Sequence, residues 1–168
     1  VLRRAEATLS EGMLANTADT GSLEYNTVDA ALWFVHAVGR HLAATGDEDL
    51  AAELAPAIAS VVDSHISGTR FGIGADADGL LRQGADGIAL TWMDARIDGV
   101  PVTQRAGKAV EINALWIQAL LIERRLAHVS RATAPDRGRL LDDAHASFFR
   151  RFVRGDGRTR GEAALEAH

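Results

Sequence analysis

The strongest constraint on the fold is a helical spacing of apolar residues that one long glycine-rich segment interrupts. Apolar residues recur every three or four positions, and no stretch shows the sustained alternation of a strand. The periodic runs that predict helices cover residues 28–45, 50–66, 110–129 and 135–152, and the end of another helix is expected at 1–9. Between them, residues 71–109 carry repeated glycines among short apolar runs. We therefore predict an all-α chain with a long ordered insertion of loops and one or two short hairpins, a length that is usually functional.

Capping and breaking residues predict where these helices begin and end. Asn26 or Thr27 can cap the first helix, and Gly46 ends it. Pro56 lies inside the second periodic run and has no N–H to donate to a helical hydrogen bond. We therefore predict a break at this point, with Pro56 in the first turn of a further helix that ends near Gly68.

The composition excludes several classes of protein. With 168 residues, 47% of them apolar, the chain can form one domain with a core, expected over residues 1–154. A formal net charge of −5 without a block of Lys or Arg disfavours nucleic acid as a partner. No cysteine is present, which excludes disulfides and thiolate zinc sites, and no apolar run reaches the roughly 18–20 residues of a membrane span. Because the chain begins with Val1, we expect a piece of a longer protein, ending in a polar tail over 155–168 that frays.

A first group of chemically useful residues, at 24–29, stands at a predicted helix start and is followed by Trp33. Asn26 and Asp29 belong to it. The simplest interpretation of Asp29 is a first-turn acid that complements the helix dipole. Carboxylates and free N–H groups at a helix N-terminus also make good partners for sugar hydroxyls, so a binding role is the alternative.

A second group lies inside the glycine-rich segment, where Asp94 follows Trp92 and Met93. An acid beside a large aromatic on a loop suits a carboxyl that is kept protonated by apolar surroundings, as a general acid requires. The alternative is a surface turn with an exposed Asp94 and a buried Trp92.

A third group crowds the approach to the helix predicted at 110–129. Lys108, which is the only lysine of the chain, stands with Arg105, Glu111 and Asn113 close to the helix start. These side chains are candidates for a polar binding site. The alternative makes Glu111 a first-turn acid and Lys108 its solvated counter-ion.

Three familiar metal and cofactor motifs are absent or incomplete. Residues 76–79 begin like a calcium loop, but glycine falls at the fourth position and no bidentate Glu follows at the twelfth. Residues 72–74 lack the third glycine of a dinucleotide fingerprint. The histidines form no pair four residues apart with a Glu between them, so a zinc site of that kind is not expected.

Taken together, these groups resemble the C-terminal amylo-α-1,6-glucosidase domain of glycogen debranching enzymes. The motifs that carry the resemblance are EYNTVDA at 24–30, LWF at 32–34, DADGLL at 76–81, LTWMDA at 90–95, VT at 102–103, GK at 107–108 and VEINALW at 110–116. They follow the family's order and spacing across about residues 12–125, and the likeness is expected to fade from about 128 onward. One such motif is weak, whereas several in register are specific.

The resemblance implies a partial six-hairpin α/α barrel whose funnel holds a terminal glucose. The family removes α-1,6-linked glucose stubs from branched α-glucan with inversion, in the cytoplasm, without a cofactor or a metal. By motif match Asp94 is the general acid, and the substrate-binding residues are Asn26, Asp29, Trp92, Lys108, Glu111 and Asn113. Inverting hydrolysis also needs a carboxylate that activates water, and the resemblance covers about three of six hairpins, so the base is expected outside this chain.

The expected partners are a branched α-glucan, such as glycogen or a limit dextrin, and the remainder of the same barrel. Half a barrel leaves apolar helix faces uncovered, so the chain alone is expected to be inactive and to self-associate or precipitate. Three alternatives stay open at this point: another inverting α/α-barrel glycosidase, a non-catalytic glycan-binding fragment, and a helical interaction module.

Overall fold

The computed structural model describes residues 1–16, 23–130, 135–153 and 155. In chain order, the elements are α1 (Leu2–Glu6), α2 (Asp29–Thr45), α3 (Glu48–Ser67), the 3-10 turn η1 (Arg70–Gly72), β1 (Gly74–Ala75), β2 (Leu81–Arg82), β3 (Arg96–Ile97), β4 (Val100–Pro101), α4 (Val110–Ser130) and α5 (Gly138–Phe152). The predicted mainly helical chain with short hairpins in its long insertion is confirmed.

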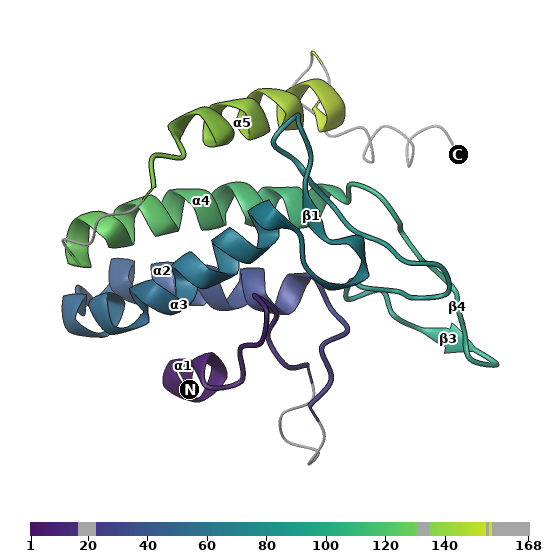
Figure 1. The fold of residues 1–168 in the computed structure, drawn as a ribbon, viewed down its shortest axis with the longest axis horizontal. Coiled ribbons are helices and arrows are strands. Elements are labelled where there is room, and N and C mark those ends of the chain that lie inside the picture. The colour runs from purple at the N-terminus through teal and green to yellow at the C-terminus, as the bar shows by residue number, and fades with distance from the viewer. Residues whose placement is uncertain (17–22, 131–134, 154, 156–168) are drawn as a thin grey trace.

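Helix α4 is the centre of the fold and packs against α2, α3 and α5 (Figure 1). Its apolar side is fully buried around Ile112 and Trp116, both 0% exposed. Helices α2 and α4 approach so closely that a Cβ added to Gly39 would lie 2.7 Å from Cδ1 of Ile122. This contact fixes the register between the two helices.

The ends of α2 confirm one predicted boundary and correct another. Gly46 ends the helix with a φ of 68°, the left-handed conformation that glycine adopts without strain. The predicted side-chain cap is wrong, because the helix begins after Val28 and no capping hydrogen bond is found there among the described residues. Asn26 instead uses its amide within the preceding loop, accepting from Asn16.

Helix α3 corrects the predicted break at Pro56, since it runs without interruption from Glu48 to Ser67. Pro56 lies on the exposed side of the helix, where water can satisfy the carbonyl that loses its helical partner. The opposite side buries Leu54 and Ile58 completely, at 1% and 0% exposure. The burial of that face holds the helix together across the proline.

The glycine-rich insertion forms two small antiparallel pairs, β1 with β2 and β3 with β4. Both pairs lie at the same end of the helical body, the right-hand end in Figure 1. A further backbone bridge joins Gln83 to Gly107 and ties the insertion to the start of α4. The insertion is therefore an ordered structure at one end of the helices.

The two ends of the chain differ in how far the structure tests them. Helix α1 confirms the helix expected at 1–9, and α5 begins at Gly138, slightly later than the predicted 135. Apart from Gly155, the tail expected over 155–168 lies outside the described residues.

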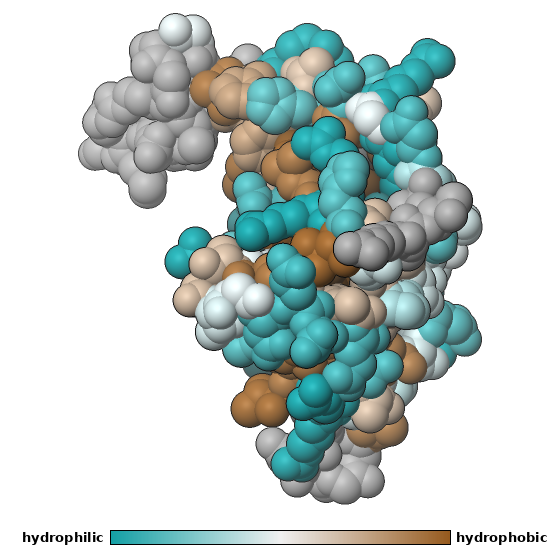
Figure 2. All heavy atoms as spheres, turned by 90° about the vertical axis from the view of Figure 1, so that its left-hand side faces the viewer, coloured by the Kyte–Doolittle hydropathy of each residue, from teal (hydrophilic) through white to brown (hydrophobic). Residues whose placement is uncertain are grey.

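Figure 2 shows the end opposite the insertion, where hydrophobic patches lie among hydrophilic side chains. No helix in the described part of the chain is long and apolar enough to cross a membrane.

Candidate active site

The candidate site lies where α2 and α4 begin, beneath the insertion. Asp29 and Glu111 occupy the first turns of these two helices, and their charges are close enough to interact. Farther along, Gly39 meets Ile122, so the two helices run in the same direction. The parallel arrangement brings the first and third sequence groups to one end of the fold, as the resemblance implies.

Asp29 joins the first group to the second. Its carboxylate oxygen Oδ2 accepts a hydrogen bond of 3.1 Å from the backbone N–H of Trp92, and the N–H of Val28 donates to the carbonyl of Leu90 at 2.8 Å. Burial raises the pKa of Asp29, although hydrogen bonds from the backbone, including that of Trp92, oppose the rise. Asp29 thus anchors the loop that carries Asp94.

Glu111 is a paired acid at the start of α4. The guanidinium of Arg105 binds both of its carboxylate oxygens, Nη1 contacting Oε1 and Nη2 contacting Oε2 at 2.8 Å. Burial acts to raise the pKa of Glu111, but Arg105, the backbone N–H and the Trp92 side chain favour the carboxylate and lower the pKa overall. Glu111 therefore carries a negative charge at neutral pH and is held in place by Arg105.

Asp94 lies on the exposed outer part of the same loop. Trp92 and Met93 are 67% and 37% exposed, and Asp94 is exposed as well. The expected apolar enclosure of Asp94 by these two neighbours is therefore not found. Of the alternative interpretation, the exposed Asp94 is confirmed and the buried Trp92 is wrong. The loop itself therefore leaves the Asp94 carboxyl open to solvent.

Asn26 stands next to this site, at the last loop before α2. Its Oδ1 accepts from Nδ2 of Asn16 at 3.2 Å, and its own Nδ2 donates to Glu24 at 3.1 Å. The side chain is half-buried and oriented by two polar neighbours, an arrangement that suits an amide presented to a sugar hydroxyl.

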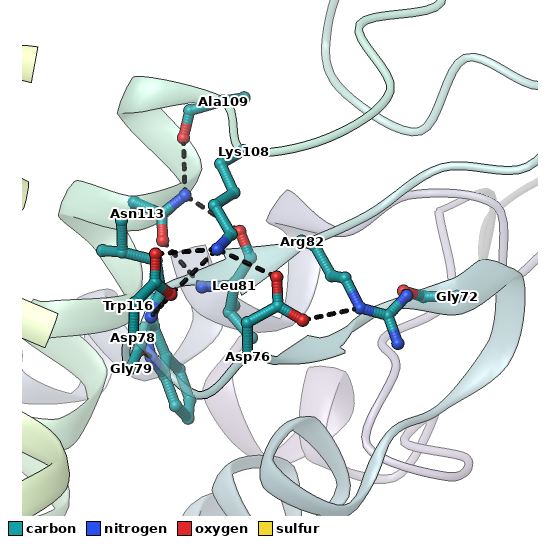
Figure 3. A network of polar contacts seen from close by, with 11 residues as sticks. Gly72, Asp76, Asp78, Gly79, Leu81, Arg82, Lys108, Ala109, Asn113 and Trp116 are labelled. Atoms are coloured by element: carbon teal, nitrogen blue, oxygen red, sulfur yellow. Dashed lines mark hydrogen bonds and ion pairs between the residues drawn. The ribbon is translucent and has the colours of Figure 1, made fainter. Parts of the chain in front are cut away.

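Lys108 is placed differently from the prediction, in the network of Figure 3. Its Nζ binds both carboxylate oxygens of Asp78 at 2.8 Å and Oδ2 of Asp76 at 2.9 Å, and its side chain is 13% exposed. Asp76 in turn accepts from Nε of Arg82 at 2.8 Å. The alternative of a solvated counter-ion to Glu111 is corrected, because Asp76 and Asp78 take up the ammonium group, whereas the predicted binding role of Lys108 stays a prediction.

Asn113 likewise makes its hydrogen bonds within the fold. It is 0% exposed, and its amide pairs with the backbone of Leu81 as a neighbouring strand would. The amide accepts from the N–H of Leu81 at 2.7 Å and donates to the carbonyl of Leu81 at 3.0 Å. A second donation, of 2.9 Å, goes to the carbonyl of Ala109. Its polar atoms are engaged and its surface is covered, an arrangement that does not favour the predicted contact with substrate, which stays a prediction.

Sequence reasoning missed the role of the segment at 76–79, which it considered only as an incomplete calcium loop. In the structure its carboxylates hold Lys108, and the indole N–H of Trp116 donates 3.0 Å to the carbonyl of Gly79 (Figure 3). A single lysine opposite two closely spaced aspartates was the available signal. No group of three or more His, Asp or Glu is placed to hold a metal ion in the described ranges.

Paired helices whose starts gather at one end define the fold class of this chain as part of an α/α barrel. The chain belongs to the amylo-alpha-1,6-glucosidase family, whose model matches residues 1–164. This confirms the family inferred from the motifs and corrects the expectation that the likeness fades near residue 128. No curated protein matches the chain.

Among solved structures, the chain is similar to a GH78 family rhamnosidase of Bacillus sp. GL1. The identity is 19%, the TM-score is 0.55, and the match covers 89% of this chain and 17% of that one. The chain thus spans less than a fifth of the length of this solved relative. The likeness confirms the fold class, a partial six-hairpin α/α barrel.

Proposed function

We propose that this chain forms part of an inverting hydrolase that removes α-1,6-linked glucose from branched α-glucan. The observation that carries the proposal is the meeting of Asp29, Trp92 and Glu111 at the shared start of α2 and α4. Family membership supports the substrate class. On this proposal residues 1–154 are one portion of a barrel, and the substrate is glycogen or a limit dextrin in the cytoplasm.

Each residue of the site has a proposed task. Asp94 protonates the glycosidic oxygen of the departing chain, and Asn26 and Asp29 hold hydroxyls of the terminal glucose. Trp92 forms an apolar wall beside that sugar. Glu111, kept ionised by Arg105, binds a further hydroxyl.

The reaction also needs a second carboxylate, which activates water on the opposite face of the sugar. In inverting enzymes the two carboxyl groups stand about 6.5–9.5 Å apart. We assign the base to the remainder of the barrel, which is the proposed partner of this chain. The same remainder would enclose the exposed Asp94.

Lys108 and Asn113 stabilise the site indirectly, through contacts within the fold. They fix the segment that contains Asp76, Asp78 and Leu81 against the start of α4. Since Glu111 begins the same helix, the network holds its backbone in place. These residues act through others and are not proposed to touch the sugar.

The test measures glucose release from a phosphorylase limit dextrin by the full-length protein that contains these residues. Asp94→Asn keeps the shape of the side chain and removes its proton, so it should abolish release while dextrin binding persists. The glucose first formed should be the β anomer, because inversion at an α linkage gives β. Release that survives Asp94→Asn would contradict the assignment of the acid, and α-glucose would contradict inversion.

The exposure of Asp94 favours a second candidate, a non-catalytic glycan-binding fragment. In that case Asp94 would serve only as a sugar contact. Dextrin binding without any release, measured on the full-length protein, would select this candidate. Release from another glycoside but not from limit dextrin would instead select a different inverting α/α-barrel glycosidase.

A further inference from the structure

A cavity lies between the second half of α4 and the start of α5, at the end of the molecule opposite the insertion (Figure 1). Its volume is about 300 Å³, at the lower end of the range of small-molecule pockets. Leu120, Ala127 and Leu141 make part of its wall apolar. Glu123, also in the wall, follows Glu111 by 12 residues and so stands about 18 Å farther along α4. The cavity is therefore separate from the candidate active site.

Arg137, at the start of α5, brings a buried positive charge to this wall. Its side chain is 10% exposed, and its Nη2 contacts both Oδ1 of Asp63 at 2.8 Å and Oε1 of Glu123 at 3.1 Å. The two acids thus contact the same nitrogen. Nε and Nη1 are buried and have no hydrogen-bond partner in the part of the chain that the structure describes. Because a buried charged donor without an acceptor is costly, an acceptor supplied at this wall would stabilise the fold.

Two further features make the cavity favourable to a negative charge. Arg124 and His128 both line it, four residues apart and so on the same face of α4. The first turn of α5 adds backbone N–H groups and the positive end of a helix dipole, and Arg137 at its N-cap makes no side-chain capping hydrogen bond. Cationic groups therefore come from both helices.

Carboxyl groups also lie at this wall, and each has a place in the balance of charge. Oδ1 of Asp136 accepts from the N–H of Gly138 at 2.9 Å, so this acid is used by the helix start. Asp63 is 63% exposed and borders a different hollow on α3, so it contacts Arg137 from outside the cavity. Burial raises the pKa of Glu123 to about 7, so its carboxyl is mostly uncharged at slightly acidic pH. Under those conditions the wall sets two arginines against the single carboxylate of Asp136.

We propose that this cavity binds a small molecule through a phosphate or carboxylate group. The oxyanion accepts hydrogen bonds from the guanidinium of Arg137, and Arg124 stabilises its charge. Guanidinium groups bind both kinds of oxyanion through charge-assisted hydrogen bonds. The remainder of the ligand packs against the apolar part of the wall. Because the wall comes from both α4 and α5, the bound ligand joins the two helices.

The test titrates the full-length protein with inorganic phosphate and, separately, with acetate. The solutions have constant ionic strength and a slightly acidic pH, at which Glu123 is mostly protonated. Binding is followed by the broadening of the phosphorus signal of phosphate and of the methyl proton signal of acetate. Thermal unfolding of each protein is recorded in parallel.

The variants are Arg137→Lys, Arg124→Gln and, as a matched control, Arg125→Gln. Arg125 is exposed on α4 like Arg124, but it is not part of the cavity wall. Arg137→Lys keeps the charge and removes the planar set of donors. Arg124→Gln removes a charge at the wall and leaves the buried contacts of Arg137 in place.

The wild-type protein should bind at least one of the two anions saturably. Arg137→Lys should weaken that binding at least about tenfold, because a lysine cannot reproduce the hydrogen bonds of a guanidinium. Arg124→Gln should weaken it about two- to fivefold, and Arg125→Gln should leave it unchanged. Binding of phosphate alone would identify a phosphate ester as the ligand class, whereas equally tight binding of acetate would identify a carboxylate.

The inference is overturned if neither anion binds saturably to the wild-type protein. It is also overturned if a folded Arg137→Lys protein keeps the wild-type affinity. Should Arg137→Lys fail to fold, because Asp63 and Glu123 lose their partner, the other two variants decide, and equal affinities of Arg124→Gln and Arg125→Gln would reject the site. Glucose release is not part of the measurement, so the result is independent of the proposed function.

Discussion

Replacing Asn113 separates a structural role from a binding role more sharply than any other substitution at this site. In Asn113→Ala the N–H and carbonyl of Leu81 lose their partner while Leu81 remains 0% exposed. The carbonyl of Ala109 keeps the backbone N–H of residue 113, at 3.1 Å. Two buried backbone groups are therefore left unpaired.

Each unpaired buried group costs about 1–3 kcal/mol, so with two such groups Asn113→Ala should lower the free energy of unfolding by about 2–6 kcal/mol. For a domain of this size that corresponds to a fall in Tm of about 4–24 °C. Asn113→Asp should be at least as damaging, because its carboxylate keeps the acceptor for the N–H of Leu81 but faces two carbonyl oxygens. Gln118→Ala removes an exposed amide from the same helix and should change stability by less than about 0.5 kcal/mol.

The assay is denaturant and thermal unfolding of the three variants, with dextrin affinity measured on the fraction that remains folded. The expected result is a large loss of stability for both Asn113 variants and an unchanged affinity per folded molecule. A stable Asn113→Ala protein with weakened dextrin binding would refute the reasoning. It would return Asn113 to the sugar contacts that its motif implies.

Three further predictions follow from particular contacts. Burial raises the pKa of Glu123 to about 7 despite the opposing charge of Arg137. Between the ordinary pKa of 4.5 and this value, the folded state keeps a proton on Glu123 that the unfolded state has lost. Stability should therefore fall by up to about 3 kcal/mol as pH rises from about 4.5 to 7, and Glu123→Gln should flatten that dependence in unfolding measured across this range. Gly79→Ala should destabilise by about 2 kcal/mol more than Gly99→Ala in chemical unfolding, because both glycines have similar positive φ but only at Gly79 would the new Cβ meet the backbone N of Ala144, at 2.6 Å. The 168-residue chain alone should release no glucose from limit dextrin and should self-associate in sedimentation experiments; a monomer with full glucosidase activity would contradict the half-barrel argument.

The sequence was sufficient for features that depend on local spacing. The helical period and Gly46 predicted α2, and the motifs at Asp29 and Glu111 predicted that two helix starts would share one site. The course of the chain at Pro56 could not be predicted, because it depends on which side of α3 faces water. The composition hinted at the partners of Lys108 but could not place them, since Asp78 lies 30 positions away and reaches the lysine only through the folded insertion.

The polar residues of this site differ in how many of their hydrogen-bonding atoms already have partners within the fold. This difference cannot be inferred from the sequence motifs. Asn113 is fully buried with its donors and acceptor engaged, and the ammonium of Lys108 is surrounded by two carboxylates. Such groups lose their fold-stabilising partners if they turn to a ligand, so substrate binding by them would cost stability. Asn26 and the loop of Asp94 remain partly or fully exposed at the same end of the helices. A ligand can therefore reach these two without dismantling the fold, and it is on them that the chemistry of this chain should depend.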